Sequence, residues 1–131
     1  MTAATPARVL IVDDDPDIRR IAEVSLGRMG GFRVHVASCG REAIELAAQM
    51  APDVVLLDVS MPDTDGTETL RALRSIPATA RIPVVFFTAA SSDAETERLL
   101  ALGAVGVIAK PFDVVDLPRR LRDILSRLGV H

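Results

Sequence analysis

Residues 9–16 read VLIVDDDP, a short apolar run followed at once by three aspartates and a proline. The apolar residues Val9–Val12 are continuous and rich in β-branched side chains, a pattern typical of a strand covered on both faces, as in a parallel sheet. An aspartate before a proline favours the start of a helix, with Asp15 as the N-cap and Pro16 in the first helical position. The stretch therefore predicts a buried strand whose carboxyl end carries carboxylates and leads into a helix.

Similar apolar runs recur along the chain. Residues 54–57 (VVLL), 84–87 (VVFF) and 105–109 (VGVIA) are equally short and continuous, and each is predicted to be a buried strand. Residues 32–36 (FRVHV) alternate between apolar and polar side chains, which indicates an edge strand with one partly solvated face. Helical stretches separate the runs, and the apolar residues that fall on one helical face are Ala43, Ile44, Ala47, Ala48 and Ala51; Leu70, Leu73 and Ile76; and Leu117, Leu121, Ile124, Leu125 and Leu128.

Five strands that alternate with five helices predict an α/β domain with a doubly wound, five-stranded parallel sheet, as in flavodoxin-like folds. With the alternating strand at an edge, the expected strand order is 2-1-3-4-5. Ligands of such folds bind outside the carboxyl ends of the strands, where the order reverses between strands one and three. The residues that follow Val12 and Leu57 are therefore the candidates for a functional site.

Size and composition fit one globular domain, with 131 residues of which 49% are hydrophobic and 25% charged. The net charge of −3 argues against the basic surface that direct nucleic-acid binding requires, and we interpret Arg119, Arg120 and Arg122 as a solvated helix face. No apolar run reaches the roughly 20 residues that span a bilayer. Residues 1–7 lack the apolar core of a signal peptide, so we expect a cytoplasmic protein without membrane insertion. The single cysteine, Cys39, excludes an internal disulfide.

Carboxylates stand at the predicted site. Asp13 and Asp14 follow the first strand and Asp58 follows the third, and neighbouring strands lie about 4.8 Å apart, so the three side chains should converge. Carboxylates that close repel one another unless a cation binds between them. A hard divalent ion with oxygen ligands suits this arrangement, and we expect Mg²⁺, because it accepts few carboxylates and keeps waters that a phosphate can replace.

Two further polar residues end the fourth and fifth predicted strands. Thr88 follows the fourth strand, and the small Ala89 after it leaves room above the sheet. Lys110 follows the fifth strand and is the only lysine beside fourteen arginines, which suggests a need for a compact, flexible ammonium group at that place. Taken alone, such a threonine is most often a good strand former, and such a lysine is most often solvated.

Four stretches taken together have a familiar order and spacing. VLIVDDDP (9–16), VVLLDVSMPDTDG (54–66), FFTA (86–89) and GAVGVIAKPF (103–112) resemble the CheY-like receiver domains of two-component response regulators. The resemblance covers about residues 8–128, and it implies one receiver domain over that range between short tails at residues 1–7 and 129–131.

The resemblance implies a phosphorelay function for this site. Asp58 would accept a phosphoryl group, and Mg²⁺ would be bound by Asp13, Asp14, Asp58 and the main-chain carbonyl of Ser60. The donor would be a sensor histidine kinase or a histidine phosphotransfer protein. We expect a signalling switch that catalyses only its own phosphorylation and dephosphorylation, acts on a downstream protein target, and forms a phosphorylation-dependent dimer.

The same resemblance assigns the two strand-end residues. Lys110 would contact the phosphoryl group, and the Thr88 hydroxyl would act as the switch by donating a hydrogen bond to it. The family also implies a cis peptide bond between Lys110 and Pro111, against a base rate of about 5–6% for bonds before proline.

Three alternatives remain open at this stage. Asp63–Thr67 (DTDGT) matches the nucleophile motif of haloacid dehalogenase-type phosphatases, but in those enzymes the first aspartate directly ends a strand. We interpret the segment as a loop in which Gly66 supplies a positive φ. The chain could instead be a pseudo-receiver that binds partners without phosphorylation, or a receiver module cut from a larger regulator with an output domain. We favour a single-domain regulator that acts through protein contacts.

Two local features allow sharper predictions. Receivers commonly carry a Tyr or Phe three residues before the lysine, but this chain has Val107, which is stiff at χ1 and too short to fill a ring-sized pocket. We therefore expect residues 88–102 to carry the signal, with little change at Val107. In the last helix Pro118 lacks an N–H, so we expect Asp116 to cap that helix and Pro118 to lie in its first turn.

Overall fold

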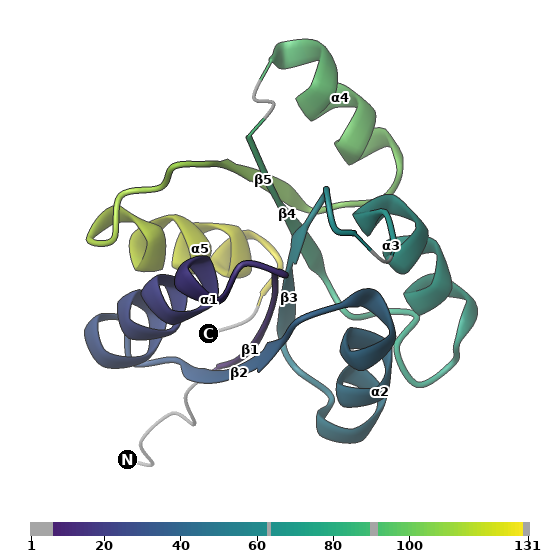
Figure 1. Cartoon of the computed structure of the whole chain (residues 1–131), viewed down its shortest axis with the longest axis horizontal. Coiled ribbons are helices and arrows are strands. Elements are labelled where there is room, and N and C mark those ends of the chain that lie inside the picture. The colour runs from purple at the N-terminus through teal and green to yellow at the C-terminus, as the bar shows by residue number, and fades with distance from the viewer. Residues whose placement is uncertain (1–6, 63, 90–91, 130–131) are drawn as a thin grey trace.

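The computed structural model describes residues 7–62, 64–89 and 92–129 of the chain. Its centre is a five-stranded sheet in the order β2-β1-β3-β4-β5, in which all neighbouring strands are parallel (Figure 1). The strands are β1 (Arg8–Val12), β2 (Arg33–Ala37), β3 (Val54–Asp58), β4 (Val84–Thr88) and β5 (Gly106–Ala109). The predicted fold class and strand order are confirmed.

Helices cover both faces of the sheet, and each face has its own apolar core. One core packs β-strand side chains against α1, η1 and α5, and the other packs them against α2, α3 and α4. The helices are α1 (Pro16–Glu23), the π-helix η1 (Val24–Met29), α2 (Gly40–Met50), α3 (Gly66–Ser75), α4 (Asp93–Ala101) and α5 (Asp116–Arg127). No helix in the described ranges is long and apolar enough to cross a membrane.

Burial along the strands follows the sequence pattern. Every residue of β3 and β4 is buried, whereas the first four residues of β2 alternate between exposed and half-buried, as predicted for an edge strand, and only Ala37 at its end is buried. The helical stripes are confirmed in their central positions, such as Ala43, Leu73 and Leu121. They are wrong at their ends, because Ala48 and Leu128 are exposed.

Helix starts depend on side-chain caps near the functional end of the sheet. Asp15 caps α1 by accepting a hydrogen bond from the Asp17 N–H, as expected of an aspartate before Pro16. The expectation for α5 was wrong by one position, since Asp116 is its first helical residue. The N-cap position is Val115, whose side chain makes no capping hydrogen bond. The Asp113 carboxylate, two residues earlier, accepts hydrogen bonds from the Val115 and Asp116 N–H groups. Pro118 lies in the first turn, as predicted.

The π-helix η1 extends α1 and was not anticipated. Its wider turn buries two consecutive side chains, Ser25 and Leu26, on the α5 side. The Ser25 hydroxyl donates a hydrogen bond to the Val114 carbonyl, which joins η1 to the loop before α5. The two residues are 89 positions apart in the sequence, so the local pattern of apolar residues could not predict this contact.

Candidate functional site

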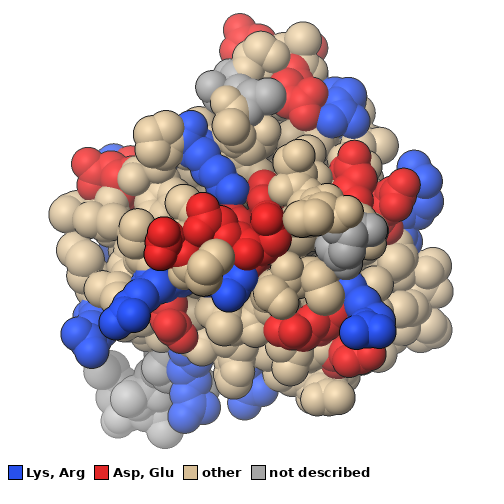
Figure 2. Space-filling view, viewed as in Figure 1, with Lys and Arg blue, Asp and Glu red and all other residues tan. Residues whose placement is uncertain are grey.

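Three carboxylates meet at the carboxyl ends of β1 and β3. Asp13, Asp14 and Asp58 each offer an oxygen atom, and the three atoms lie within 4.8 Å of one another. Asp13 is 1% exposed and Asp58 is 5% exposed, while Asp14 lies at the surface. Figure 2 shows the red patch that acidic side chains form near the middle of this face. The predicted convergence is confirmed.

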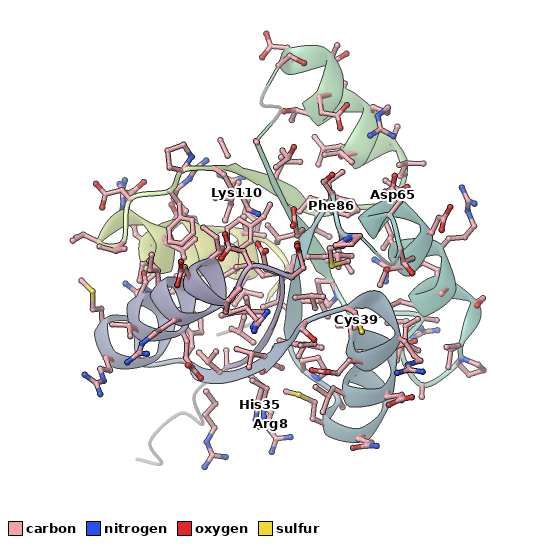
Figure 3. All side chains as sticks on the ribbon, in the orientation of Figure 1. Arg8, His35, Cys39, Asp65, Phe86 and Lys110 are labelled. Atoms are coloured by element: carbon pink, nitrogen blue, oxygen red, sulfur yellow. The ribbon has the colours of Figure 1, made fainter. Side chains whose placement is uncertain are left out.

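Lys110 lies among these carboxylates at the end of β5 (Figure 3). Its Nζ is 2.6 Å from Asp13 Oδ2 and 3.3 Å from Asp58 Oδ1, and its side chain is 17% exposed. The peptide bond between Lys110 and Pro111 is cis, as predicted. The pocket thus brings three carboxylates and one ammonium group together, which leaves an excess of negative charge.

The charges perturb one another's ionisation. Burial and the nearby charge of Asp13 raise the pKa of Asp58 above its ordinary value, and Lys110 and the Ser60 N–H offset only part of this rise. For Lys110, burial lowers the pKa, but hydrogen bonds and charges from Asp13 and Asp58 outweigh it, so the pKa is raised. These surroundings therefore favour the neutral form of Asp58 and the charged form of Lys110.

Asp13 is held by more contacts than the sequence suggested. The Asp15 N–H donates to its Oδ1 at 2.9 Å, and its own N–H donates to the Ala37 carbonyl at 3.1 Å. The Arg19 Nη1 donates to its main-chain carbonyl at 2.7 Å. Sequence reasoning missed Arg19, although its place at the end of the first turn of a helix that starts at Pro16 could have suggested a contact with the preceding loop.

The loop after β3 fits closely under Asp58. The Ser60 N–H lies 3.3 Å from Asp58 Oδ1, and the Gly66 N–H donates to the Val59 carbonyl at 2.7 Å. The expectation of a positive φ at Gly66 was wrong: Gly66 is the first residue of α3, with Asp65 as its N-cap. The reason for glycine is steric, since a Cβ there would lie 2.3 Å from the Asp58 carbonyl oxygen.

Thr88 and Lys110 are joined through the backbone. Thr88 ends β4 with 4% exposure, and its carbonyl accepts a hydrogen bond of 2.9 Å from the Lys110 N–H. Ala89 is exposed, whereas Ala90 and Ser91 lie outside the described residues. Val107, in place of the usual aromatic residue, is half-buried on β5 and pairs in register with Phe86.

The sequence profile described as "Response regulator receiver domain" matches residues 9–122. This chain belongs to that family. It is a signalling module rather than an enzyme of the ordinary kind, and its three carboxylates are the acidic triad typical of a receiver Mg²⁺ site. The phosphatase alternative is wrong, because β3 already ends at Asp58, before the DTDGT segment. Asp63 itself lies outside the described residues.

Solved structures support the assignment of this receiver. The chemotaxis response regulator CheY4 of Vibrio cholerae superposes with a TM-score of 0.85 at 33% identity, over 92% of this chain and 99% of that chain. A putative response regulator from Chloroflexus aurantiacus gives a TM-score of 0.84 at 32% identity, over 94% of this chain and 100% of that chain.

The receiver is also similar to curated proteins that are longer than itself. The response regulator MprA of Mycolicibacterium vanbaalenii is 41% identical over 122 residues, which cover 93% of this chain and 52% of that protein. The transcriptional regulatory protein TrcR of Mycobacterium tuberculosis is 38% identical, with coverage of 94% and 47%. The chain thus spans about half the length of these relatives.

Proposed function

We propose that this receiver accepts a phosphoryl group on Asp58 from a phosphohistidine, in a reaction that needs Mg²⁺. The donor is a sensor histidine kinase or a histidine phosphotransfer protein. The observation that carries the proposal is the convergence of Asp13, Asp14 and Asp58 around the ammonium group of Lys110. Because such a kinase consumes ATP, we propose that the protein acts in the cytoplasm.

The donor set fits a magnesium ion. Asp13, Asp14 and Asp58 supply hard oxygen ligands within reach of one centre, and the main-chain carbonyl of Ser60 is the fourth proposed ligand. When bound, the ion neutralises charge on the carboxylates and on the phosphoryl oxygens. Burial and the neighbouring charge of Asp13 raise the pKa of Asp58 in spite of Lys110, and a bound cation would favour its charged form.

Asp58 is the nucleophile of the proposed reaction. One of its carboxylate oxygens forms a bond to phosphorus while the bond from phosphorus to the donor's imidazole nitrogen breaks, and the nitrogen leaves with its electron pair. Lys110 Nζ is 3.3 Å from Asp58 Oδ1, so it can donate to the transferred group without leaving the pocket. It thereby stabilises the charge that develops on the phosphoryl oxygens.

Thr88 converts this chemistry into a change of shape. Its hydroxyl is proposed to donate a hydrogen bond to a phosphoryl oxygen, which draws the end of β4 toward Asp58. The loop that follows leads directly into α4, so the movement reaches the surface there. A downstream protein, or a second phosphorylated copy, would recognise the altered surface.

The domain that acts in this way is proposed to span residues 8–128. Relatives such as TrcR are named as transcriptional regulatory proteins and are about twice as long as this chain. Control of transcription within a larger regulator is therefore the second candidate, beside a single-domain regulator that acts through protein contacts. In both cases the receiver chemistry is the same.

Labelling with a small phosphodonor tests the proposal. Acetyl phosphate with Mg²⁺ should add one phosphoryl group to the protein, as measured by intact mass, and removal of Mg²⁺ by a chelator should prevent it. Asp58→Asn keeps the shape of the side chain but removes the nucleophile, so it should abolish labelling, whereas Asp14→Ala should mainly raise the Mg²⁺ concentration required. Asp123→Asn on the exposed face of α5 is the matched control and should label normally.

Two outcomes would contradict the assignment. Normal labelling of Asp58→Asn would place the phosphoacceptor elsewhere. An unlabelled wild-type protein that still binds a kinase would indicate a pseudo-receiver.

A further inference from the structure

A groove of about 650 Å³ runs between α1–η1 and the edge strand β2. Its floor is apolar and consists of Val24, Phe32, Val34 and Val36. Val24 is 41% exposed and the other three are half-buried, so their apolar surfaces remain open to a partner. Asp13, Asp14, Asp58, Thr88 and Lys110 do not line the groove, which lies on the face of β2 that is covered by α1 and η1.

The rim of the groove is basic. Arg19, Arg20 and Arg28 line it together with a single acidic residue, Glu23. Arg19 already binds the Asp13 carbonyl, but Arg20 and Arg28 are exposed and form no ion pair within the described ranges. Blue side chains over α1 are visible at the lower left of Figure 2. The rim therefore attracts carboxylates, although the whole protein has a net charge of −3.

The outer edge of β2 offers main-chain hydrogen-bonding groups beside the groove. The Arg33 N–H and the Ala37 carbonyl bond to residues that flank β1, so these alternate positions point inward. Because main-chain groups alternate in direction along a strand, those of Val34 and Val36 point outward. β2 is the end strand of the sheet, and no other strand of the described chain pairs with this edge.

Charge on β2 lies on the opposite side from the groove. Arg33 and His35 are in register with Arg8 and Leu10. Leu10 packs in the core beneath α2, and Arg8 donates a hydrogen bond to the Met50 carbonyl at the end of α2. Figure 3 shows His35 at the outer edge of the sheet. Charged side chains often protect an edge strand from unwanted pairing. Here they leave the side of β2 that faces α1 lined by valines.

We propose that this edge and groove bind an extended segment of a partner protein that carries apolar and acidic side chains on the same face, at every second residue. The segment adds to β2 as a sixth strand through the outward main-chain groups of Val34 and Val36. Its apolar side chains enter the groove, and its carboxylates bind Arg20 and Arg28. The proposal is independent of phosphorylation at Asp58.

Nucleic acid fits this surface less well than such a peptide. Single strands bind through exposed aromatic rings on which bases stack. The one ring in this groove is Phe32, and the Arg122 guanidinium already lies over it, 6.0 Å from the ring centroid. The remaining floor consists of aliphatic side chains, which suit valine or leucine side chains from an extended peptide.

A designed peptide tests the proposal on the intact protein. The probe is an acetylated octapeptide, Glu-Thr-Val-Thr-Val-Thr-Glu-Thr, whose valines and glutamates lie on one face of the extended chain. It is added at pH 7 to isotopically labelled protein and followed by amide chemical shifts. Saturable shifts should concentrate in residues 20–36 on α1, η1 and β2. A control peptide of the same composition, Thr-Glu-Val-Thr-Val-Glu-Thr-Thr, places both glutamates on the face opposite the valines, and a second control has lysine in place of each glutamate of the probe. Each should bind at least about tenfold more weakly, because neither presents carboxylates to Arg20 and Arg28.

Charge reversal on the protein provides the matched test. The double variant Arg20→Glu, Arg28→Glu should weaken binding of the probe by about tenfold or more. Arg71→Glu, Arg81→Glu, which reverses two exposed arginines remote from the groove, should leave binding within about twofold of wild type. All four side chains are exposed, and the amide spectra of both variants will show whether the fold is retained.

Several results would overturn the proposal. These are no binding by millimolar probe, equal binding of the control peptide whose glutamates lie on the opposite face, or shifts centred outside residues 20–36. Tighter binding of a single-stranded oligonucleotide at the same arginines would assign the groove to nucleic acid instead. If the double variant does not fold, the shift map and the peptide comparison on the wild-type protein decide.

Discussion

Polar side chains at the amino ends of the strands bind main-chain carbonyls, whereas those at the carboxyl ends crowd like charges together. Near the amino ends of β4 and β5, Arg74 donates to the Ile82 carbonyl at 2.7 Å, and Thr79 donates to the Leu73 carbonyl at 2.6 Å. Near the carboxyl ends, Asp13 and Asp58 are buried beside Asp14, with Lys110 as the balancing cation.

The contrast separates residues that hold the fold from residues that carry its chemistry. Burying a carbonyl without a hydrogen bond has a desolvation cost, and a hydrogen bond to that carbonyl removes most of this cost. The contacts at the amino ends therefore stabilise the folded state. Crowded carboxylates do the opposite, and their repulsion is relieved only by a cation or a proton. The carboxyl ends are therefore arranged for a ligand at some expense of stability.

The largest expected effect is a variant that loses the chemistry of the site without losing stability. Asp58→Asn should lose all labelling by acetyl phosphate, yet its free energy of unfolding should equal or exceed that of wild type. The reason is that the substitution removes one of three mutually repelling carboxylates. Urea unfolding in the presence of a chelator measures this free energy, with Asp123→Asn as the control. A large loss of stability would show that Asp58 supports the fold.

Thr79→Val should give the converse result. It removes the hydroxyl that serves the buried Leu73 carbonyl and should lower the free energy of unfolding by about 1–3 kcal/mol. Labelling at saturating Mg²⁺ should be unchanged, since Thr79 lies far from Asp58 along the strands. Thr96→Val on α4, which removes a hydroxyl with no hydrogen bond within the described residues, should change stability by less than about 0.5 kcal/mol.

Arg19 offers a smaller effect on metal binding. Arg19→Ala removes the donor to the Asp13 carbonyl, so the loop that carries two proposed ligands should be less well fixed. Loss of about 1 kcal/mol corresponds to roughly fivefold weaker Mg²⁺ binding, measurable by calorimetry. Arg19→Lys should restore part of the affinity, and the neighbouring Arg20→Ala should leave it unchanged. Equal effects of both alanine variants would argue against a positioning role for Arg19.

Ionisation of Asp58 should contribute to the pH dependence of the free energy of unfolding. Its pKa is raised in the folded state, so the folded protein binds this proton more tightly than the unfolded chain does. Between the unfolded pKa, near 3.8, and the raised folded value, the contribution of Asp58 to stability falls as pH rises. Urea titrations in chelator should show this slope in wild type and a flatter one in Asp58→Asn. Added Mg²⁺ should offset the loss at neutral pH.

The smallest expected effect concerns which residues change conformation when a phosphoryl mimic binds at Asp58. With beryllofluoride as a phosphoryl mimic, amide shifts should be largest at Thr88, Ala89 and α4, and small at Val107, which is too short to swing like an aromatic ring. Amino-end residues such as Thr79 should not move. If shifts centre on Val107 while residues 88–102 stay unchanged, the proposed route is wrong.

Much of this protein could be predicted from local sequence because the necessary information is local. Continuous apolar runs such as Val54–Leu57 predict buried parallel strands, and alternation in residues 32–36 predicts the edge. Since the carboxyl ends of parallel strands meet at one edge, the convergence of Asp13, Asp14 and Asp58 also followed. The errors lie where helices end, as at the start of α5, because several neighbouring residues can cap an end equally well.

What the sequence determined by itself was the sheet, its order and the set of residues at its functional edge. Only the tertiary structure decided which groups those residues contact: Lys110 pairs more closely with Asp13 than with Asp58, and Arg19 binds a backbone carbonyl. Gly66 is required by the approach of Asp58, not by its own φ. Lys110 and Asp13 are separated by 97 residues, and contacts of that kind depend on how whole elements pack, which no local period of side chains encodes.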